Sequence, residues 1–487
     1  MAQAANQADS TRDIESGTGS ATPVAETGAG DANRKLSWTR RSVLVLQPWW
    51  LSALLVFIPF AWASHWLVDT WGHEVEFVLC FIAIIPLQNI FELCGEQLAE
   101  HTGKDLGEFI CITFKNCVEA TLALILLRNC HLRLLQSTIV GVVVLHLLLV
   151  QGMTFLIGGS QTRKQTLNDH HVSVNPSLLM VGVLSIVVPT AFFASLDRGH
   201  DTSPLDSPMF SPLVGDLLRD SVLKMSRAIA IMLFCVYVAS RIYRHVPWPP
   251  TVEWFSSLAH PSSLRTCLLA TERPPNKVAG TSADSEQTQE TPVAESAKVP
   301  LAALAVFIVV SIAVMCVTAE FLVERIDPVR ERSGIPAEWF GLVLLPLVSF
   351  LPEAALAIIS FIPTRKHKSD VPDTMARGTP IDLSIQFTLW WMPLVILVGW
   401  WTGKPIHLLF DYFEVALLLG TCILVNYVTA DGETNFAEGF TMFTFYAMLA
   451  TATWFYPGQP QVAFLLSCPG SVAEAVASGV EDTLALL

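Results

Sequence analysis

Apolar runs of about 20 residues recur along this 487-residue chain and constrain its fold more than any other feature. A helix needs about 20 such residues to cross the hydrocarbon core of a bilayer. Backbone N–H and C=O groups find no water there, so each run is expected to be an α-helix. Because 52% of the residues are hydrophobic and only 15% are charged, we predict an all-α polytopic membrane protein. Eleven spans are predicted, near residues 45–67, 75–94, 106–128, 134–157, 177–196, 222–243, 300–323, 336–362, 382–402, 407–429 and 437–456.

The polar segments outside these spans divide the chain. Residues 1–42 are rich in Ala, Gly, Ser and Thr, which predicts a disordered tail. Four basic residues between positions 34 and 41 precede the leading helix, 43–70, so the positive-inside rule places the amino terminus in the cytoplasm. Residues 245–299, rich in Pro, Ser, Thr and Glu, are predicted to be a flexible cytoplasmic linker. Residues 458–487 form a tail to which the sequence assigns no role.

The same rule accounts for most of the loops but not for all of them. Alternating the spans from a cytoplasmic start places the basic pairs at 163–164 and 241–244 in the cytoplasm, as the rule requires. Arg128 and Arg133 then lie on the far side, against the rule.

The linker separates two blocks of five spans, residues 71–244 and 300–457. Two blocks with an odd number of spans enter the membrane from opposite sides, which is the arrangement of inverted-repeat transporters. The first span of each block ends in a similar pattern, EQLAE at 96–100 and EFLVE at 320–324. Each pattern precedes a span with a carboxylate in its middle. The predicted architecture is therefore one leading helix and two inverted repeats of five helices.

Those two carboxylates belong to Glu119 and Glu353. A carboxylate at the centre of a span costs roughly 2.5–3.5 kcal/mol on insertion scales, so its presence indicates a cation or proton site. We expect the two side chains to meet near the middle of the bilayer. The alternative is that each is paired with a basic neighbour or stays protonated in the protein interior.

Other features of the composition exclude competing classes. The net charge of -14 lies largely in the amino-terminal tail and the loops, which argues against nucleic-acid partners. No phosphate-binding loop, dinucleotide fingerprint or nucleophile-elbow motif occurs, so we expect neither an enzyme nor a cofactor. Transport would then draw on an ion gradient. The expected partners are the lipid bilayer and the transported ions, and a homo-oligomer stays open. The ten cysteines are expected to be buried thiols.

Motifs in both blocks match those of one transporter family. The matching stretches are EQLA at 96–99, FKNCVE at 114–119, residues 178–192, 227–237, 319–324, 341–348 and 393–400, FDYFE at 410–414, and residues 425–432 and 454–457. On these stretches the chain resembles the cation/proton exchangers of the calcium/cation antiporter superfamily, most closely the fungal vacuolar Ca²⁺/H⁺ exchangers. The resemblance implies an eleven-helix antiporter of the vacuolar membrane that moves Ca²⁺ into the lumen in exchange for H⁺.

The resemblance also implies a set of site residues. Glu119 and Glu353 would bind Ca²⁺ and protons in turn, since a divalent ion wants several oxygen ligands and carboxylates to balance its charge. Asn116, Gln386 and Ser384 would add ligands, although Asn116 could instead satisfy a broken helix backbone. Gln386 and Ser384 could instead link helices by hydrogen bonds. Supporting roles fall to three further residues, which could also be solvated helix ends: Glu96, Glu320 and Gln136.

The chain departs from the family pattern around this site. Lys115 replaces a glycine four residues before Glu119, where the two side chains of a continuous helix would share one face. Its ammonium could pair with Glu119 and occupy the position of the cation. The other departures are Phe350 for an asparagine, Val142 and Leu383 for serines, and His146 for an asparagine. We therefore expect a lowered Ca²⁺ affinity. The alternative function is that of a homologue that is silent in transport or prefers Mn²⁺ or another cation, and that regulates or partners an active exchanger.

Overall fold

The computed structural model describes most of the membrane region and leaves the long polar segments out. The described residues are 53–102, 104–161, 165–166, 175–197, 215–245, 300–361, 379–468, 470–472 and 474. The predicted amino-terminal tail, nearly all of the linker and the last residues of the chain lie outside this part, so the predictions for them stay predictions.

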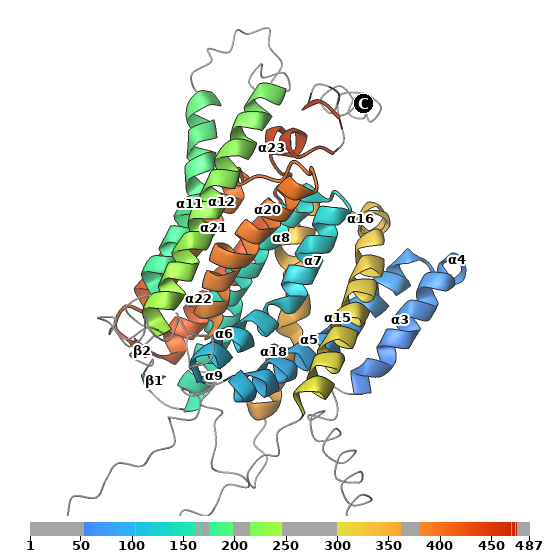
Figure 1. Ribbon diagram of the computed structural model, residues 1–487, viewed down its shortest axis with the longest axis vertical. Coiled ribbons are helices and arrows are strands. Elements are labelled where there is room, and N and C mark those ends of the chain that lie inside the picture. The colour runs from blue at the N-terminus through green and yellow to red at the C-terminus, as the bar shows by residue number, and fades with distance from the viewer. Residues whose placement is uncertain are drawn as a thin grey trace, which may run out of the picture. The chain divides into compact units, whose positions relative to one another are not determined.

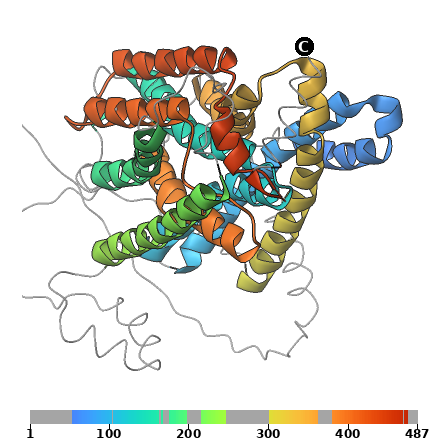
Figure 2. The same ribbon diagram turned by 90° about the horizontal axis from the view of Figure 1, so that it is seen from above.

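The first half of the described chain is helical, as the apolar runs predict. It comprises η1 (Leu54–Val56), α3 (Phe57–Trp66), α4 (Val68–Trp71), α5 (His73–Thr102), α6 (Lys104–Lys115), α7 (Cys117–Arg128), α8 (Leu132–Val144), η2 (Leu145–Val150), α9 (Gln151–Gln161), α11 (Asn175–Asp197) and α12 (Asp216–His245). Figures 1 and 2 show α11 and α12 side by side, at the edge opposite to α3.

The second half repeats this helical character. It comprises α15 (Leu301–Glu324), α16 (Ile326–Ser333), α17 (Ala337–Trp339), η3 (Phe340–Leu344), α18 (Leu345–Phe361), α19 (Thr379–Gln386), η4 (Phe387–Trp391), α20 (Met392–Trp401), α21 (Tyr412–Val428), α22 (Phe436–Trp454) and α23 (Pro460–Leu465). The two short strands, β1 (Gln165–Thr166) and β2 (Glu433–Thr434), pair antiparallel and link the two halves.

Membrane-length helices confirm the all-α membrane fold. Six described segments are long and apolar enough to cross a bilayer: His73–Thr102, Leu132–Ser160, Pro176–Leu196, Asp216–Tyr243, Leu301–Ser333 and Thr379–Trp401. The pair α6 and α7 forms a further candidate span that is bent by 52°. Shorter apolar helices cover Leu54–Trp66, Ala337–Pro352 and Tyr412–Val428. The total of eleven spans stays a prediction.

Irregularities occur at related places in the two blocks. The segment α8–η2–α9 has a π-helical stretch in its middle, and so has α19–η4–α20 in the second block. The spans that precede them are also irregular, since α6 and α7 are separated by a break and α18 follows the π-helical η3. Wider helical turns of this kind are frequent at functional sites. These irregularities are compatible with two related blocks, and the inverted repeat itself stays a prediction.

Two glycines bring the blocks together. Gly141 on α8 faces the backbone of Leu342 on η3 so closely that an added Cβ would overlap the Leu342 carbonyl group. Gly341 lies against the Ser137 side chain, where an added Cβ would come within 2.7 Å of the Ser137 Cβ. Small residues let helix backbones approach in membranes. The helices α8 and η3 are held side by side as a result.

A disulfide corrects the expectation that all cysteines are buried thiols. Cys130, in the turn between α7 and α8, is bonded to Cys468, just after α23. The two residues are 338 positions apart, and no spacing signal in the sequence pairs them. Figure 1 shows α23 at the end of the bundle where this turn lies. The start of the C-terminal tail is thereby attached to the first block.

Candidate functional site

The predicted site lies at the break between α6 and α7. Asn116 occupies the break and precedes α7, and Glu119 follows in the first turn of α7. Both side chains are buried, at 0% and 3% exposure. The amino terminus of a helix favours a negative charge, so the broken helix helps to hold a carboxylate at this depth. Gln88 of α5 donates to the Lys115 carbonyl oxygen at 2.9 Å, which satisfies a backbone group that the break leaves open.

Asn116 connects the two blocks through an amide network. Its Nδ2 donates to Gln386 Oε1 at 2.9 Å and to the Leu383 carbonyl oxygen at 3.3 Å. Gln386 Nε2 in turn donates to Thr113 Oγ1 at 2.8 Å. Asn116 Oδ1 is buried and has no hydrogen-bond partner among the described residues. Asn116 and Gln386 therefore link helices and, in addition, leave an amide oxygen beside Glu119 that can accept.

The other predicted positions around Asn116 are mostly apolar. Val142, Leu383 and Phe350 are buried, and none of these side chains offers an oxygen ligand. Ser384 Oγ donates within its own helix to the Pro380 carbonyl oxygen at 2.9 Å. His146 Nε2, on η2, lies 3.7 Å from Glu119 Oε1. The imidazole of His146 is thus a described neighbour of the Glu119 carboxylate, and three of the predicted positions carry apolar side chains.

Lys115 has a close partner that its spacing to Glu119 did not predict. Its Nζ lies 2.5 Å from Glu92 Oε1 on α5. The helix ends at Lys115 and resumes at Cys117, so the geometry of a continuous helix does not apply between Lys115 and Glu119. Gly95 on α5 packs against Phe114, which places the α5 face that carries Glu92 against α6. An ion pair between adjacent helices therefore holds the ammonium.

Glu353 lies on α18, and its side chain is outside the described part of the chain. The helix itself packs against α5, α7, α8 and η2. Of these, α7 carries Glu119 and η2 carries His146. The distance between the two carboxylates stays a prediction.

The three supporting residues have different surroundings. Glu96 is exposed. Glu320 accepts from Asn129 Nδ2 at 3.3 Å and lies 3.6 Å from Arg128 Nη1. Gln136 is fully buried, and its Nε2 donates to the carbonyl oxygens of His407 and Leu409 at 2.8 and 3.1 Å. Gln136 is therefore not a solvated helix end, because it connects α8 to the loop before α21.

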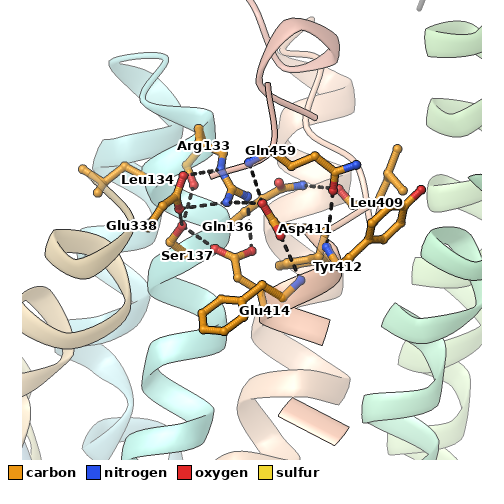
Figure 3. Close-up of polar contacts among 12 residues, drawn as sticks. Arg133, Leu134, Gln136, Ser137, Glu338, Leu409, Asp411, Tyr412, Glu414 and Gln459 are labelled. Carbon is orange, nitrogen blue, oxygen red and sulfur yellow. Dashed lines mark hydrogen bonds and ion pairs between the residues drawn. The ribbon is translucent and has the colours of Figure 1, made fainter. Parts of the chain in front are cut away.

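Sequence reasoning missed a buried ionic cluster next to Gln136 (Figure 3). Its members come from α8, α17 and the start of α21, and we call them the Arg133 cluster: Arg133, Ser137, Glu338, Asp411 and Glu414. Side-chain exposure is 16% for Arg133, 9% for Glu338, 0% for Asp411 and 1% for Glu414. Two signals were available: the position of Arg133 against the positive-inside rule, because a buried arginine needs acidic partners, and the two acids of the FDYFE stretch at 410–414.

Arg133 reaches all three acids of this cluster. Its Nε and Nη2 bond the two oxygens of Glu338 at 3.0 and 2.8 Å, a two-pronged pairing that suits a guanidinium group. Nη2 also lies 3.2 Å from Asp411 Oδ2, and Nη1 lies 3.2 Å from Glu414 Oε2. The Arg133 cluster therefore ties the amino-terminal ends of α8, α17 and α21 together.

The described residues contain no group of three His, Cys, Asp or Glu side chains that could hold a metal ion. The proposed site needs ligands from both blocks. The Glu353 side chain lies outside the described part of the chain, so this search did not include it.

Comparison with known proteins places this architecture in a family. The model of the sodium/calcium exchanger protein family matches residues 75–245 and 303–455. A vacuolar calcium ion transporter of Cryptococcus neoformans var. grubii is 30% identical over 474 residues, with 87% of this chain and 76% of that protein covered. A Ca²⁺/H⁺ antiporter of Synechocystis sp. is 28% identical, with 83% and 96% covered.

Solved structures have the same fold. Native YfkE superposes with a TM-score of 0.59 at 18% sequence identity, over 83% of this chain and 100% of that chain. The H⁺/Ca²⁺ exchanger CAX superposes with a TM-score of 0.51 at 10% identity, over 90% and 94%. The family match covers residues 75–245 and 303–455, well over half of the chain, and this chain therefore belongs to the sodium/calcium exchanger protein family.

Proposed function

We propose that this chain exchanges Ca²⁺ for H⁺ across the vacuolar membrane, with Glu119 and Glu353 binding the cation and protons in turn. One observation carries the proposal: the buried Glu119 carboxylate starts the second half of a broken helix, beside an Asn116 amide oxygen that accepts no described hydrogen bond. The names of the relatives, a vacuolar calcium ion transporter and a Ca²⁺/H⁺ antiporter, support the choice of ions and of membrane.

The mechanism follows from charge balance. Two carboxylates neutralise a divalent cation in a medium that tolerates little net charge. The amide oxygens of Asn116 and Gln386 and the Ser384 hydroxyl would complete the ligand set. When the cation leaves, the two acids are left with uncompensated charge, and protons restore neutrality. Each cation that crosses in one direction is therefore linked to protons that cross in the other.

The disulfide supports the proposed orientation. Three predicted spans precede Cys130, and eight predicted spans lie between Cys130 and Cys468. An even number of spans between them places both cysteines on the same side of the membrane, as their bond requires. Disulfides persist in oxidising compartments and are rare in the cytosol. With a cytoplasmic amino terminus, an odd number of crossings puts both cysteines on the lumenal side. The start of the C-terminal tail would then face the lumen.

The decisive experiment is flux counting with the purified full chain in lipid vesicles. With an acidic interior, we expect external Ca²⁺ to accumulate, and we expect dissipation of the pH difference to stop the uptake. The same vesicles are assayed with Mn²⁺ and Na⁺ to measure ion preference. Vesicles that accumulate none of these ions under the imposed pH difference would contradict the proposal.

A second candidate function is supported by the apolar surroundings of the site. Phe350, Val142 and Leu383 are buried where the resemblance implies polar ligands, so the number of oxygen donors is reduced. Such a chain could keep the scaffold, transport no ion, and regulate an active exchanger. An absence of flux in a protein that is folded by its melting curve would favour this function.

The Glu92–Lys115 ion pair leads to a prediction about cation affinity. Glu92→Gln removes the carboxylate 2.5 Å from Lys115 Nζ, and we expect the ammonium to compete more strongly with Ca²⁺ near Glu119. We expect the KM for Ca²⁺ uptake to rise about tenfold, which corresponds to about 1.4 kcal/mol. The double change Glu92→Gln with Lys115→Gln removes both charges and should restore the KM. A double variant as impaired as Glu92→Gln alone would show that the ammonium does not compete.

A further inference from the structure

The Ser137 hydroxyl group stands between two carboxyl groups of the Arg133 cluster. Ser137 Oγ lies 2.6 Å from Glu414 Oε1 and 2.8 Å from Glu338 Oε2, as Figure 3 shows. A serine hydroxyl has one hydrogen, so it can donate to only one of these oxygens. The contact of Ser137 Oγ with the second carboxyl oxygen is then a hydrogen bond only if that carboxyl group is protonated and donates to the serine oxygen. Two ionised carboxylates do not satisfy this geometry.

The hydrogen-bond partners identify which acid carries the proton. Glu338 pairs through both oxygens with Arg133, so it is ionised. Asp411 is also ionised, because its two oxygens accept four hydrogen bonds, from Tyr456 Oη at 2.6 Å, Gln459 N at 2.8 Å, Phe413 N at 2.9 Å and Arg133 Nη2 at 3.2 Å. Glu414 has a single 3.2 Å contact with Arg133 besides Ser137. The extra hydrogen therefore belongs on Glu414 Oε1.

The charges around Glu414 support the same assignment. Arg133 is the cation that contacts it, against the carboxylates of Glu338 and Asp411. In the loop before α21, His407 Nδ1 is buried 3.4 Å from Gln136 Nε2, which can only donate, so this ring nitrogen accepts and the ring adds no positive charge. After α22, the Tyr456 hydroxyl donates to Asp411 Oδ1 at 2.6 Å and is therefore neutral as well. With all three acids ionised, the buried cluster would have two uncompensated negative charges.

Two buried polar groups on α21 and α8, the helices that carry Glu414 and Ser137, have unused hydrogen-bonding capacity. Thr421 lies seven residues after Glu414 and so on the same face of α21, and its hydroxyl has no partner among the described residues. Gln136 Oε1, in the residue before Ser137, is also buried without a described partner. From α11, the Thr190 hydroxyl contacts the backbone of Phe410 and not an acid.

We propose that Glu414 is a proton-binding site of this chain, with a proton on Oε1 that is donated to Ser137 Oγ, while the Ser137 hydroxyl donates to Glu338. The site is separate from Glu119, which lies nine residues before the end of α7, about 14 Å along the helix. Loss of the proton would place a second uncompensated negative charge between α8, α17 and α21. The packing of these three helices is thereby linked to proton occupancy, whichever ion the chain transports.

Infrared spectroscopy of the purified full chain in lipid tests this directly, without any transport measurement. At neutral pH we expect carbonyl bands of protonated carboxylic acids, and we expect Glu414→Gln to remove one component, distinct from any contribution of Glu119 and Glu353. The control Glu331→Gln changes an exposed glutamate on α16 and should leave this component unchanged. Ser137→Ala should shift the position of this component, because the acid loses its hydrogen-bond acceptor. Carbonyl bands that all survive Glu414→Gln unchanged would overturn the assignment.

Melting curves provide an independent readout. A proton that is bound in the folded state and released on unfolding makes the folded state less stable as the pH rises. The melting temperature of the unsubstituted chain should therefore fall between pH 5 and pH 8, and that of Glu414→Gln should fall less. The glutamine can still donate to Ser137 and accept from Arg133, so Glu414→Gln should fold. If Glu414→Gln does not fold while Glu338→Gln does, Glu414 is the ionised partner of Arg133 and the proposal is wrong.

Discussion

Arg133→Met is expected to prevent the chain from accumulating as a folded protein. The substitution removes the one guanidinium group that pairs with Glu338, Asp411 and Glu414, and it leaves at least two ionised carboxylates buried. Breaking a buried ion pair from one side costs about 3–5 kcal/mol. The free energy of unfolding of a folded protein is only about 5–15 kcal/mol, so this loss is a large part of it. The measurement is the yield of monodisperse protein after detergent extraction, together with its melting temperature.

The matched control for this prediction is Arg330→Met. Arg330 pairs with Asp327 on the exposed helix α16 at 3.0 Å, and exposed pairs of this kind contribute about 1 kcal/mol or less. Its yield should therefore stay close to that of the unsubstituted chain. Arg133→Lys should be intermediate, because an ammonium cannot bond both oxygens of Glu338 and reach the other acids at the same time. Equal yields and melting temperatures for Arg133→Met and Arg330→Met would show that the cluster does not stabilise the fold.

Glu119→Gln is expected to abolish Ca²⁺ uptake driven by a pH difference, and so is Glu353→Gln. The amide keeps the size of the side chain, so the helix packing around Glu119 should survive. The amide has no negative charge to balance Ca²⁺ and no acidic proton to release. The substitution therefore removes a group that both Ca²⁺ binding and proton binding require. Uptake into vesicles should fall to the level of vesicles without protein, while the melting temperature changes little.

The control for the two glutamate variants is Glu331→Gln, which has the same chemistry at an exposed position. Uptake by this variant should equal that of the unsubstituted chain. If Glu119→Gln retains uptake within about twofold of the original, which is about 0.4 kcal/mol, the carboxylate does not bind the transported ion. If only Glu353→Gln abolishes uptake, the site contains a single essential acid, and the exchange ratio must be measured again.

Much of the fold could be predicted because the decisive signals are local. A run of apolar residues long enough for a bilayer has few solutions other than a helix. The unfavourable burial of Glu119 in such a run also predicted a special position before any neighbour was known, and the structure places the helix break three residues away, at Asn116. The repeated order of motifs predicted two related blocks, and the π-helical stretches η2 and η4 occur at related places in both.

The partners of the charged residues could not be predicted in the same way. The spacing of four residues suggested that Lys115 could pair with Glu119, but it did not suggest the ion pair with Glu92 on α5 that the structure shows. Gln136 was compatible with a solvated helix end, and it is fully buried against a loop some 270 residues later. Spacing along a helix predicts neighbours only while the helix continues.

By itself, the sequence determined that this chain is a helical membrane protein of two related blocks with a carboxylate where lipid would exclude one. Only the tertiary structure decided which groups neutralise the buried charges: Glu92 for Lys115, and the acids of α17 and α21 for Arg133. It also decided that Cys130 and Cys468 are bonded. The physical reason is that hydrophobicity is a property of each segment, whereas a buried charge is compensated by whichever side chain the packing brings within about 3 Å.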